Sequence, residues 1–272
     1  MTITIGIDIG STYTKTVALD DQENILAKDA RHTGFKLDIV SEESWRACIE
    51  EAGLTEADIN YTVSTGIGRH LCPVKDIFVT DLTASARGAA RLFPNTRTIL
   101  DVGGQTMKAI RLEDNAKVKN FRLNDKCAAG TGAFLEKTAR YMGYTTEEIG
   151  PLLTTAKDPA AISGVCAVFA ESEVINQLSL GTPPSDIMQG AIESLVLRCV
   201  QLMKRVKAEE EFTLIGGIMR FSTVPGEVEK QLENVVNVPE GEMCMYTTAL
   251  GAAILGHVRL AKLGEEREVS TA

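Results

Sequence analysis

The residues best suited to chemistry in this sequence are two cysteines, each of which precedes a predicted helix. Cys127 stands in NDKCAAGTG at 124–132, and Cys166 stands in SGVCAVFAESEVI at 163–175. Apolar residues recur at helical spacing after both cysteines, so each thiol is expected at or just before a helix N-terminus. There the helix dipole and the unpaired N–H groups stabilise a thiolate, the form of cysteine that attacks substrates or binds metals.

The chemistry open to this pair is limited by the rest of the chain. The sequence has no CxxC pair, and none of its 3 histidines lies near either cysteine along the chain. Two cysteines cannot complete a four-thiolate iron–sulfur site, but two copies of the pair can, across the twofold axis of a dimer. The residues alone therefore leave structural thiols, reactive or redox-sensing thiols and a shared cluster open. The other cysteines are expected to be buried thiols: Cys48, Cys72, Cys199 and Cys244.

A second chemical pattern occurs twice. IGIDIGSTYTKTVAL at 5–19 and ILDVGGQTMKAIRL at 99–112 each contain an apolar stretch, an aspartate, a glycine, a lysine and a second apolar stretch, at the same spacing. Each copy predicts a β-hairpin with a glycine-containing turn. The equivalent residues are Asp8, Gly10 and Lys15 in the first copy and Asp101, Gly103 and Lys108 in the second.

Turns of this kind suit phosphate. A turn rich in glycine and hydroxyl groups exposes backbone N–H groups to phosphate oxygens, and an aspartate at a strand end can hold Mg²⁺, usually through water. Two facing turns would clamp the phosphates of a nucleotide, whereas a single turn would more simply be an ordinary hairpin. No GxxxxGK[ST] motif occurs, and no GxGxxG follows a predicted strand, so the common P-loop and dinucleotide-binding motifs are absent.

The elements that must position these residues suggest an α/β protein of two lobes. The first lobe is expected at 1–97 and the second at 98–246, with a C-terminal helix of about 247–263 packed back on the first. Each hairpin is followed by a charged turn and a third apolar stretch, which predicts a three-stranded meander in each lobe. A long helix is predicted over 185–208, with Ser185 as its N-cap.

Composition excludes several classes of partner. A net charge of −9 argues against a nucleic-acid-binding face, which would need to be basic. The apolar run at 249–256 is too short to span a bilayer. The first ten residues, MTITIGIDIG, predict a strand rather than a signal peptide. We therefore expect a cytoplasmic protein with neither a nucleic-acid nor a membrane partner.

The paired hairpins resemble the actin, Hsp70 and sugar-kinase superfamily once a third element is added. FTLIGGIMR at 212–220 predicts a strand that runs into Gly216 and Gly217, and glycines there let the backbone approach a planar ring closely. The resemblance implies two RNase H-like lobes with a nucleotide cleft between them. It also implies that the hairpins are the phosphate loops and that Gly216 and Gly217 lie beside the adenosine.

The cysteine segments resemble a narrower group. NDKCAAGTG-x-FLE followed by CxVFAESEVINQLS is similar to activators of 2-hydroxyacyl-CoA dehydratases and to ATPase subunits of benzoyl-CoA reductases, in the BadF/BadG/BcrA/BcrD ATPase family. The resemblance implies that Cys127 and Cys166 from each of two subunits bind one [4Fe–4S] cluster at a dimer interface. It spans nearly the whole chain, with further similar motifs at 6–12, 65–69, 86–89, 100–105, 216–217 and 249–253.

This resemblance implies an ATP-hydrolysing electron-transfer subunit that binds ATP or ADP with Mg²⁺. The implied partners are a second ATPase subunit, homologous or identical, a ferredoxin or flavodoxin donor, and cluster-bearing subunits of a CoA-thioester reductase or dehydratase. Asp8, Asp101 and Gln105 are the expected catalytic residues, and the two aspartates are also expected metal ligands. The expected phosphate contacts are Gly10, Ser11, Thr12, Gly103, Gly104 and Gln105. Lys15 either reaches a phosphate or is simply solvated.

Three departures from the activator pattern favour a benzoyl-CoA reductase subunit, with a dehydratase activator as the alternative. Thr106 stands where activators commonly have aspartate, Ser85 stands where histidine is common, and the usual asparagine after Gly217 is missing. Two rival functions remain. A small-molecule kinase of the same fold would explain the hairpins but leave both cysteines without a role. A regulator that binds nucleotide without turnover would fit the altered positions.

Overall fold

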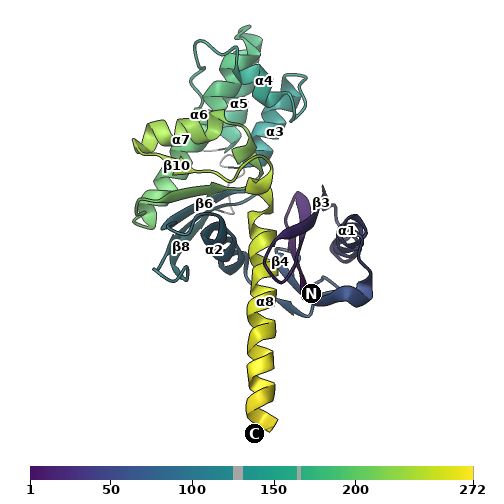
Figure 1. Ribbon diagram of the computed structural model, residues 1–272. Coiled ribbons are helices and arrows are strands. Elements are labelled where there is room, and N and C mark those ends of the chain that lie inside the picture. The colour runs from purple at the N-terminus through teal and green to yellow at the C-terminus, as the bar shows by residue number, and fades with distance from the viewer. Residues whose placement is uncertain (125–130, 164–166, 272) are drawn as a thin grey trace. The chain divides into compact units, whose positions relative to one another are not determined.

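The chain divides into two units, each with its own sheet and hydrophobic core. The structure is a computed structural model that describes residues 1–124, 131–163 and 167–271 (Figure 1). Unit 1 comprises Met1–Asn95, Asp114–Val118 and Met245–Ala272, and unit 2 comprises Thr96–Glu113 and Lys119–Cys244. Both sheets are mixed and carry helices, which confirms the predicted α/β class.

The sheet of unit 1 has the strand order β3-β2-β1-β4-β5. β1 and β2 form the predicted hairpin, β3 continues it as a meander, and β4 lies parallel to β1 on its other side. All seven residues of β1 are buried, as expected for a central strand covered on both faces. The strands are β1 (Ile3–Ile9), β2 (Tyr13–Leu19), β3 (Ile25–His32), β4 (Ile59–Gly66) and β5 (Ile77–Phe78).

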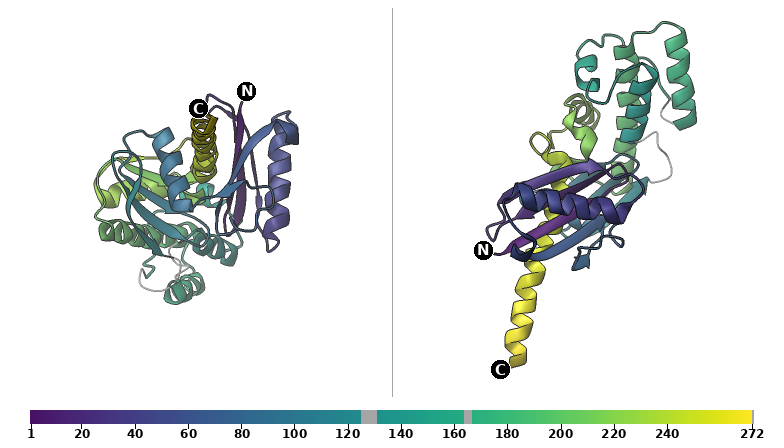
Figure 2. Two further views of the ribbon diagram at one scale, coloured as in Figure 1. Left: turned by 90° about the horizontal axis from the view of Figure 1, so that it is seen from below. Right: turned by 90° about the vertical axis from the view of Figure 1, so that its right-hand side faces the viewer.

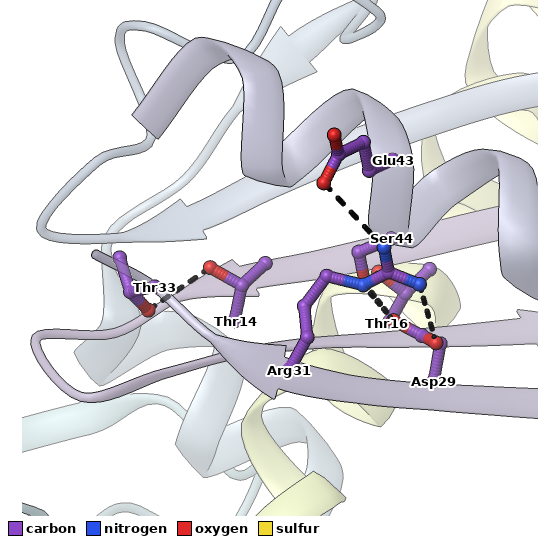
Figure 3. Close-up of polar contacts among 7 residues, drawn as sticks. All are labelled: Thr14, Thr16, Asp29, Arg31, Thr33, Glu43 and Ser44. Atoms are coloured by element: carbon purple, nitrogen blue, oxygen red, sulfur yellow. Dashed lines mark hydrogen bonds and ion pairs between the residues drawn. The ribbon is translucent and has the colours of Figure 1, made fainter. Parts of the chain in front are cut away.

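Helix α1 (Leu37–Glu51) covers one face of this sheet (Figure 2). Apolar side chains from β1 meet Trp45 and Cys48 of α1 in the core of that face. Polar contacts add to the packing (Figure 3): the hydroxyls of Thr16 and Ser44 lie 2.7 Å apart, and Ser44 donates to Asp29 at 2.6 Å. Arg31 donates two hydrogen bonds to the same carboxylate, so β2, β3 and α1 are joined through one polar network.

The other face of this sheet is covered by α2 (Asp81–Leu92) and α8 (Met243–Thr271). Glycines allow the two helices to cross with their backbones in contact: a Cβ on Gly88 would lie 1.9 Å from the Thr247 carbonyl oxygen, and one on Gly251 would lie 1.8 Å from that of Ala84. This close approach explains the small residues at 86–89 and 249–253. α8 extends well beyond the helix of about 247–263 that the sequence predicts.

The sheet of unit 2 repeats the same strand plan, in the order β10-β9-β6-β7-β8. β6 and β7 form the second predicted hairpin, and β9 lies parallel to β6 as β4 does to β1. The strands are β6 (Thr98–Val102), β7 (Met107–Leu112), β8 (Val118–Asn124), β9 (Phe212–Ile215) and β10 (Val236–Asn237). The two meanders predicted from the duplicated motif are therefore present.

Helices form the rest of unit 2 around one large apolar core to which α6 contributes the most residues. α6 begins at Pro184, with Pro183 at the N-cap, so the expected N-cap Ser185 is wrong. Proline has a suitable fixed φ for the first helical turn and its missing N–H costs nothing there. The helices are α3 (Gly132–Tyr141), α4 (Ile149–Leu153), α5 (Ala167–Ser179), α6 (Pro184–Arg205) and α7 (Thr223–Leu232), with a 3₁₀ turn at Gly217–Arg220.

Candidate functional site

The two hairpin turns have the same hydrogen-bonding pattern. In unit 1 the Gly10 N–H donates to the Tyr13 carbonyl at 3.1 Å, and in unit 2 the Gly103 N–H donates to the Thr106 carbonyl at 2.9 Å. Each bond closes a turn of four residues between paired strands. Thr106 thus occupies the place of Tyr13 and supports the turn through its backbone, a role that requires no particular side chain.

Each hairpin holds a buried aspartate paired with a lysine. Asp8 is the Cα partner of Lys15 and Asp101 is the Cα partner of Lys108, so both side chains of each pair lie on one face of the sheet. The lysine Nζ lies 2.5 Å from Asp8 Oδ2 in unit 1 and 2.9 Å from Asp101 Oδ2 in unit 2. The Lys15 side chain is only 14% exposed, so it is not the solvated lysine considered as an alternative.

The turns themselves remain open to a ligand. Gln105 is exposed, and the other expected phosphate-binding residues are partly exposed: Gly10, Ser11, Thr12, Gly103 and Gly104. The structure therefore brings a carboxylate, an ammonium group and a partly exposed turn together at the end of each hairpin. This combination suits a phosphate anion with an associated cation. In the second hairpin the ammonium group belongs to Lys108, which was not among the expected site residues. Its match to Lys15 in the duplicated motif could have identified it.

A glycine on the neighbouring parallel strand extends the duplication beyond the hairpins. Gly66 ends β4 with φ +84°, and Gly216 follows β9 with φ +103°. A Cβ on Gly66 would lie 2.4 Å from the Ile9 carbonyl oxygen, and one on Gly216 would lie 2.2 Å from that of Val102. Both positions therefore require glycine, so that the strand end can approach the hairpin. Sequence comparison of the hairpins missed Gly66.

Gly216 and Gly217, expected beside the adenosine, are both partly exposed. The N–H of Gly216 donates to the Cys244 carbonyl at 2.8 Å, which fixes the end of β9. Apart from its neighbours in the chain, no atom of the described residues lies within 4 Å of the place that a Cβ on Gly217 would take, so the backbone there has open space beside it. Open space beside a partly exposed glycine is compatible with a planar ligand ring.

The second hairpin turn is hydrogen-bonded directly to the start of α3. The Gly132 N–H donates to the Gly103 carbonyl at 2.9 Å, and the Ala133 N–H donates to the Gly104 carbonyl at 2.8 Å. A Cβ on Gly132 would lie 2.9 Å from Ile218 Cγ2 and 3.4 Å from the Gly103 oxygen, so glycine permits this contact. A displacement of the turn would therefore act on the N-terminus of α3 with no intervening residue.

α3 and α5 are the helices that follow the two cysteines of interest. Cys127 and Cys166 themselves lie outside the described residues, but α5 begins at Ala167 and α3 at Gly132, as the sequence predicts. Lys137 of α3 lies 2.7 Å from Glu171 of α5, and this carboxylate raises the pKa of Lys137. The two helices are thus connected to each other as well as, through α3, to the second hairpin.

The four described cysteines are buried, which confirms the expectation of structural thiols. Burial raises the pKa of the Cys48 and Cys199 thiols to about 12 and also raises that of Cys72. Cys244 is 2% exposed, and its Sγ donates to the Gly241 carbonyl. Buried, protonated thiols are poor metal ligands. Among the described residues, no group of three or more histidine, cysteine, aspartate and glutamate side chains could hold a metal ion.

Ser85, which stands where histidine is common in activators, has a packing role in unit 1. Its side chain is fully buried, and its hydroxyl lies 2.9 Å from that of Thr248 across the contact between α2 and α8. This hydrogen bond satisfies both buried hydroxyls.

Within the part of the chain that the structure describes, no helix is long and apolar enough to cross a membrane.

Comparison with known proteins identifies the sequence family. Residues 5–256 match the sequence model of the BadF/BadG/BcrA/BcrD ATPase family. The chain is 40% identical over 257 residues to an activator of lactoyl-CoA dehydratase from Anaerotignum propionicum. The aligned region covers 93% of this chain and 97% of the relative. It is 37% identical over 289 residues to one of the subunits of benzoyl-CoA reductase from Thauera aromatica, with both chains fully covered.

Solved structures agree. The activator of 2-hydroxyisocaproyl-CoA dehydratase from Clostridium difficile with bound ADPNP superposes with a TM-score of 0.91 at 34% identity, over 97% of this chain and 98% of that one. A ROK family glucokinase from Streptomyces griseus superposes with a TM-score of 0.56 at 15% identity, over 93% of this chain and 99% of that one. The second likeness shows the fold alone, which is that of the actin, Hsp70 and sugar-kinase superfamily.

Proposed function

Because this chain belongs to the BadF/BadG/BcrA/BcrD ATPase family, we propose that it hydrolyses ATP to drive low-potential electrons into a CoA-thioester partner enzyme. The single observation that carries the proposal is the direct hydrogen bonding between the second hairpin turn and the start of α3. That helix follows Cys127, so the proposed phosphate site and the proposed cluster site share one structural element.

The nucleotide half of the proposal rests on the hairpins. The turn N–H groups of each hairpin bind phosphate oxygens, while Asp8 and Asp101 hold the cation and, with Gln105, orient the attacking water. Each aspartate uses Oδ2 for its lysine, so Oδ1 is the oxygen offered to a hydrated cation, and Mg²⁺ commonly keeps several of its waters. Mg²⁺ supplies positive charge against the phosphate oxygens when it is bound. Gly216 and Gly217 flank the adenosine.

The cluster half rests on which thiols remain available. Since the four described cysteines are buried, Cys127 and Cys166 are the ligands we propose for iron. One chain then offers two ligands, and a [4Fe–4S] cluster held by four thiolates requires a second ATPase chain, identical or homologous. When bound, the cluster supplies a one-electron carrier. The dipole of the helix that follows each cysteine favours a thiolate near its N-terminus.

Coupling between the halves follows from the contacts of unit 2. A change at Gly103 and Gly104 between nucleotide states moves the N-terminus of α3, and the Lys137–Glu171 pair carries that movement to α5. Both cysteine segments then respond to the nucleotide. The energetic demand is substantial, because moving one electron against 100 mV costs about 2.3 kcal/mol. Electron transfer against several hundred millivolts therefore needs a structural change of this kind.

The partner is the least specified part of the proposal. Named relatives include activators of dehydratases at 40% and 36% identity and a benzoyl-CoA reductase subunit at 37%. The departures from the activator pattern favoured a benzoyl-CoA reductase, but the sequence identities give no such preference. Both classes of partner enzyme are therefore supported equally. A ferredoxin or flavodoxin is the electron donor we propose for either.

Iron and sulfide analysis with electron paramagnetic resonance tests the proposal. We expect about two irons per chain after anaerobic purification, a reduced-cluster signal with dithionite, and loss of both in Cys127→Ala and Cys166→Ala while ATP hydrolysis persists. Cys48→Ala should retain its iron. An iron-free wild-type protein that phosphorylates an alcohol or carboxylate would favour the kinase alternative. Tight ATP binding without hydrolysis, even with a partner enzyme present, would favour a regulator.

A further inference from the structure

Three side chains form a row across the sheet of unit 1 at the first hairpin. Asp8 of β1 is the Cα partner of Lys15 on β2 and of Thr65 on β4. Side chains of directly paired residues project from the same face of a sheet. The row Lys15–Asp8–Thr65 therefore places the Thr65 hydroxyl next to the carboxylate that we propose as the site of cation and water binding.

Contacts on both faces of the sheet support this orientation. The residues that alternate with the row face α1: Thr16 contacts Ser44, and Ile7 and Ile9 belong to the core that includes Trp45. Figure 3 shows the corresponding contacts of β2 with β3 and α1. On the face of the row itself, Val63 packs with residues of α2 and α8, two positions before Thr65 on the same strand. Thr65 and Asp8 therefore share the face opposite α1.

The Thr65 hydroxyl is buried without a hydrogen-bond partner among the described residues. The residue is 0% exposed, and among the described residues its Oγ1 is one of the few buried side-chain nitrogen or oxygen atoms that make no hydrogen bond. Native proteins satisfy most buried hydroxyls, so one without a protein partner next to a charged group is a place where a water molecule or a ligand can be held. Gly66 lies next to it, and a Cβ there would be 2.6 Å from Asp8 Oδ1, so the carboxylate reaches the end of β4.

Unit 2 provides an internal reference. There Asp101 is the Cα partner of Lys108 on β7 and of Ile215 on β9, so the place of Thr65 is taken by an apolar residue. Gly216 follows Ile215 as Gly66 follows Thr65, which makes the two positions equivalent. The scaffold is therefore stable without a hydroxyl at this position. Thr65 is a local specialisation of unit 1 rather than a requirement of the fold.

We propose that Thr65 is a positioning residue for ATP hydrolysis, an inference that rests on the proposed function. Its hydroxyl holds a water molecule against the Asp8 carboxylate. The water oxygen forms a bond to the terminal phosphorus, the bond from that phosphorus to the bridging oxygen breaks, and the electron pair leaves on ADP. The water gives a proton to Asp8 as it attacks. Fixed orientation of the nucleophile is the main protein contribution to phosphoryl transfer.

The test compares Thr65→Val, Thr65→Ser and Thr4→Val in the full-length anaerobic protein. Valine keeps the shape of threonine and removes the hydroxyl, and serine restores it. Thr4→Val is the matched control, because Thr4 is equally buried on β1 but its hydroxyl donates to the Ala253 carbonyl at 3.0 Å. The measurements are kcat and KM for ATP and the midpoint of denaturant unfolding.

We expect Thr65→Val to lower kcat about tenfold or more with KM within about twofold of wild type. Its unfolding midpoint should equal or exceed that of wild type, because an unsatisfied buried hydroxyl is removed. Thr65→Ser should recover most of kcat, and Thr4→Val should lose stability with little change in kcat. Wild-type kcat in Thr65→Val, or a kcat loss that only parallels a loss of stability, would overturn the inference. A wild-type protein without ATPase activity would overturn the proposed function as well.

Discussion

In unit 1 the aspartate of the first hairpin has Thr65 beside it on the parallel strand, and in unit 2 the equivalent place is taken by Ile215. The second hairpin differs in another respect, because its turn accepts hydrogen bonds from Gly132 and Ala133 at the start of α3. The strand order, the Asp–Lys pair and the glycine after the parallel strand are the same in both. One duplicated scaffold therefore carries two specialisations.

These differences suggest a division of labour between the units. Unit 1 offers a polar neighbour to its aspartate, which suits the positioning of water. Unit 2 offers a mechanical connection to α3, and through Lys137 and Glu171 to α5. The variants below test this division.

The largest effect is expected from the two aspartates. Asp8→Asn should lower kcat for ATP hydrolysis by about 100-fold or more, as is typical when a preorganised charged group is removed from a catalytic site. Asp101→Asn should cause a smaller loss, because the apolar Ile215 takes the place of Thr65 on the strand paired with that aspartate. Steady-state ATPase assays with matched iron content give the comparison. An equal loss in both variants would argue against the asymmetry.

Equivalent losses of stability are expected at the two glycines after the parallel strands. Gly66→Ala and Gly216→Ala both force a side chain to positive φ and against a backbone carbonyl. Each should lower the free energy of unfolding by about 2–5 kcal/mol through strain and overpacking. Urea denaturation measures this, with Gly226→Ala as the control, because a Cβ at Gly226 meets nothing within 4 Å in the described part of the chain beyond its own helix and neighbours. Loss at only one site would contradict the structural equivalence.

Gly132→Ala should affect coupling more than hydrolysis. Its Cβ would lie 2.9 Å from Ile218 Cγ2, so either this side chain or the start of α3 must shift, and we expect the shift to weaken the contact between α3 and the second turn. We expect the rate of ATP hydrolysis to stay within about twofold of wild type, while the rate of ATP-dependent electron transfer falls roughly tenfold. A roughly tenfold effect lies in the range typical of coupling between two sites. Gly226→Ala again serves as the control. If electron transfer and hydrolysis fell together in Gly132→Ala, the contact would serve catalysis instead of transmission.

The smallest effect on turnover is expected from Ile215→Thr. This change gives unit 2 the hydroxyl that unit 1 has at Thr65, in a position that is 1% exposed. The free energy of unfolding should fall by about 1–3 kcal/mol if the hydroxyl finds no partner, while kcat for ATP stays within about twofold. Denaturation and ATPase assays on the same preparation test both. An increase in kcat would show that the second aspartate can also use such a group.

Much of this site could be predicted because it is encoded in residue types. The aspartate, glycine and lysine at equal spacing in 5–19 and 99–112 identified both hairpins, but not the ion pair that joins the aspartate and the lysine in each. Gly66 was not recognised as the counterpart of Gly216, because the segments between hairpin and parallel strand differ greatly in length. Strand pairing is a long-range property that spacing along the chain does not reveal.

Two other features could not be predicted for physical reasons. The bonds from Gly132 and Ala133 to the second turn join backbone groups, and nearly every residue type carries the same N–H and C=O. That the Thr65 hydroxyl has no hydrogen-bond partner among the described residues depends on everything packed around it, which no local pattern records. Ser185 was expected as an N-cap from its residue type, but the N-cap is Pro183, two residues earlier, and the helix begins at Pro184.

The central claim, that the proposed phosphate site of unit 2 controls the helices that follow the two cysteines, can be tested most directly by iron chelation. The reduced protein is mixed anaerobically with an iron chelator, without nucleotide, with ADP and with a non-hydrolysable ATP analogue, and the rate of iron release is measured. We expect the rate to depend on the nucleotide in wild type and in Gly226→Ala, and to lose that dependence in Gly132→Ala. An identical rate in all nucleotide states of the wild type, or an unchanged response in Gly132→Ala, would contradict the claim.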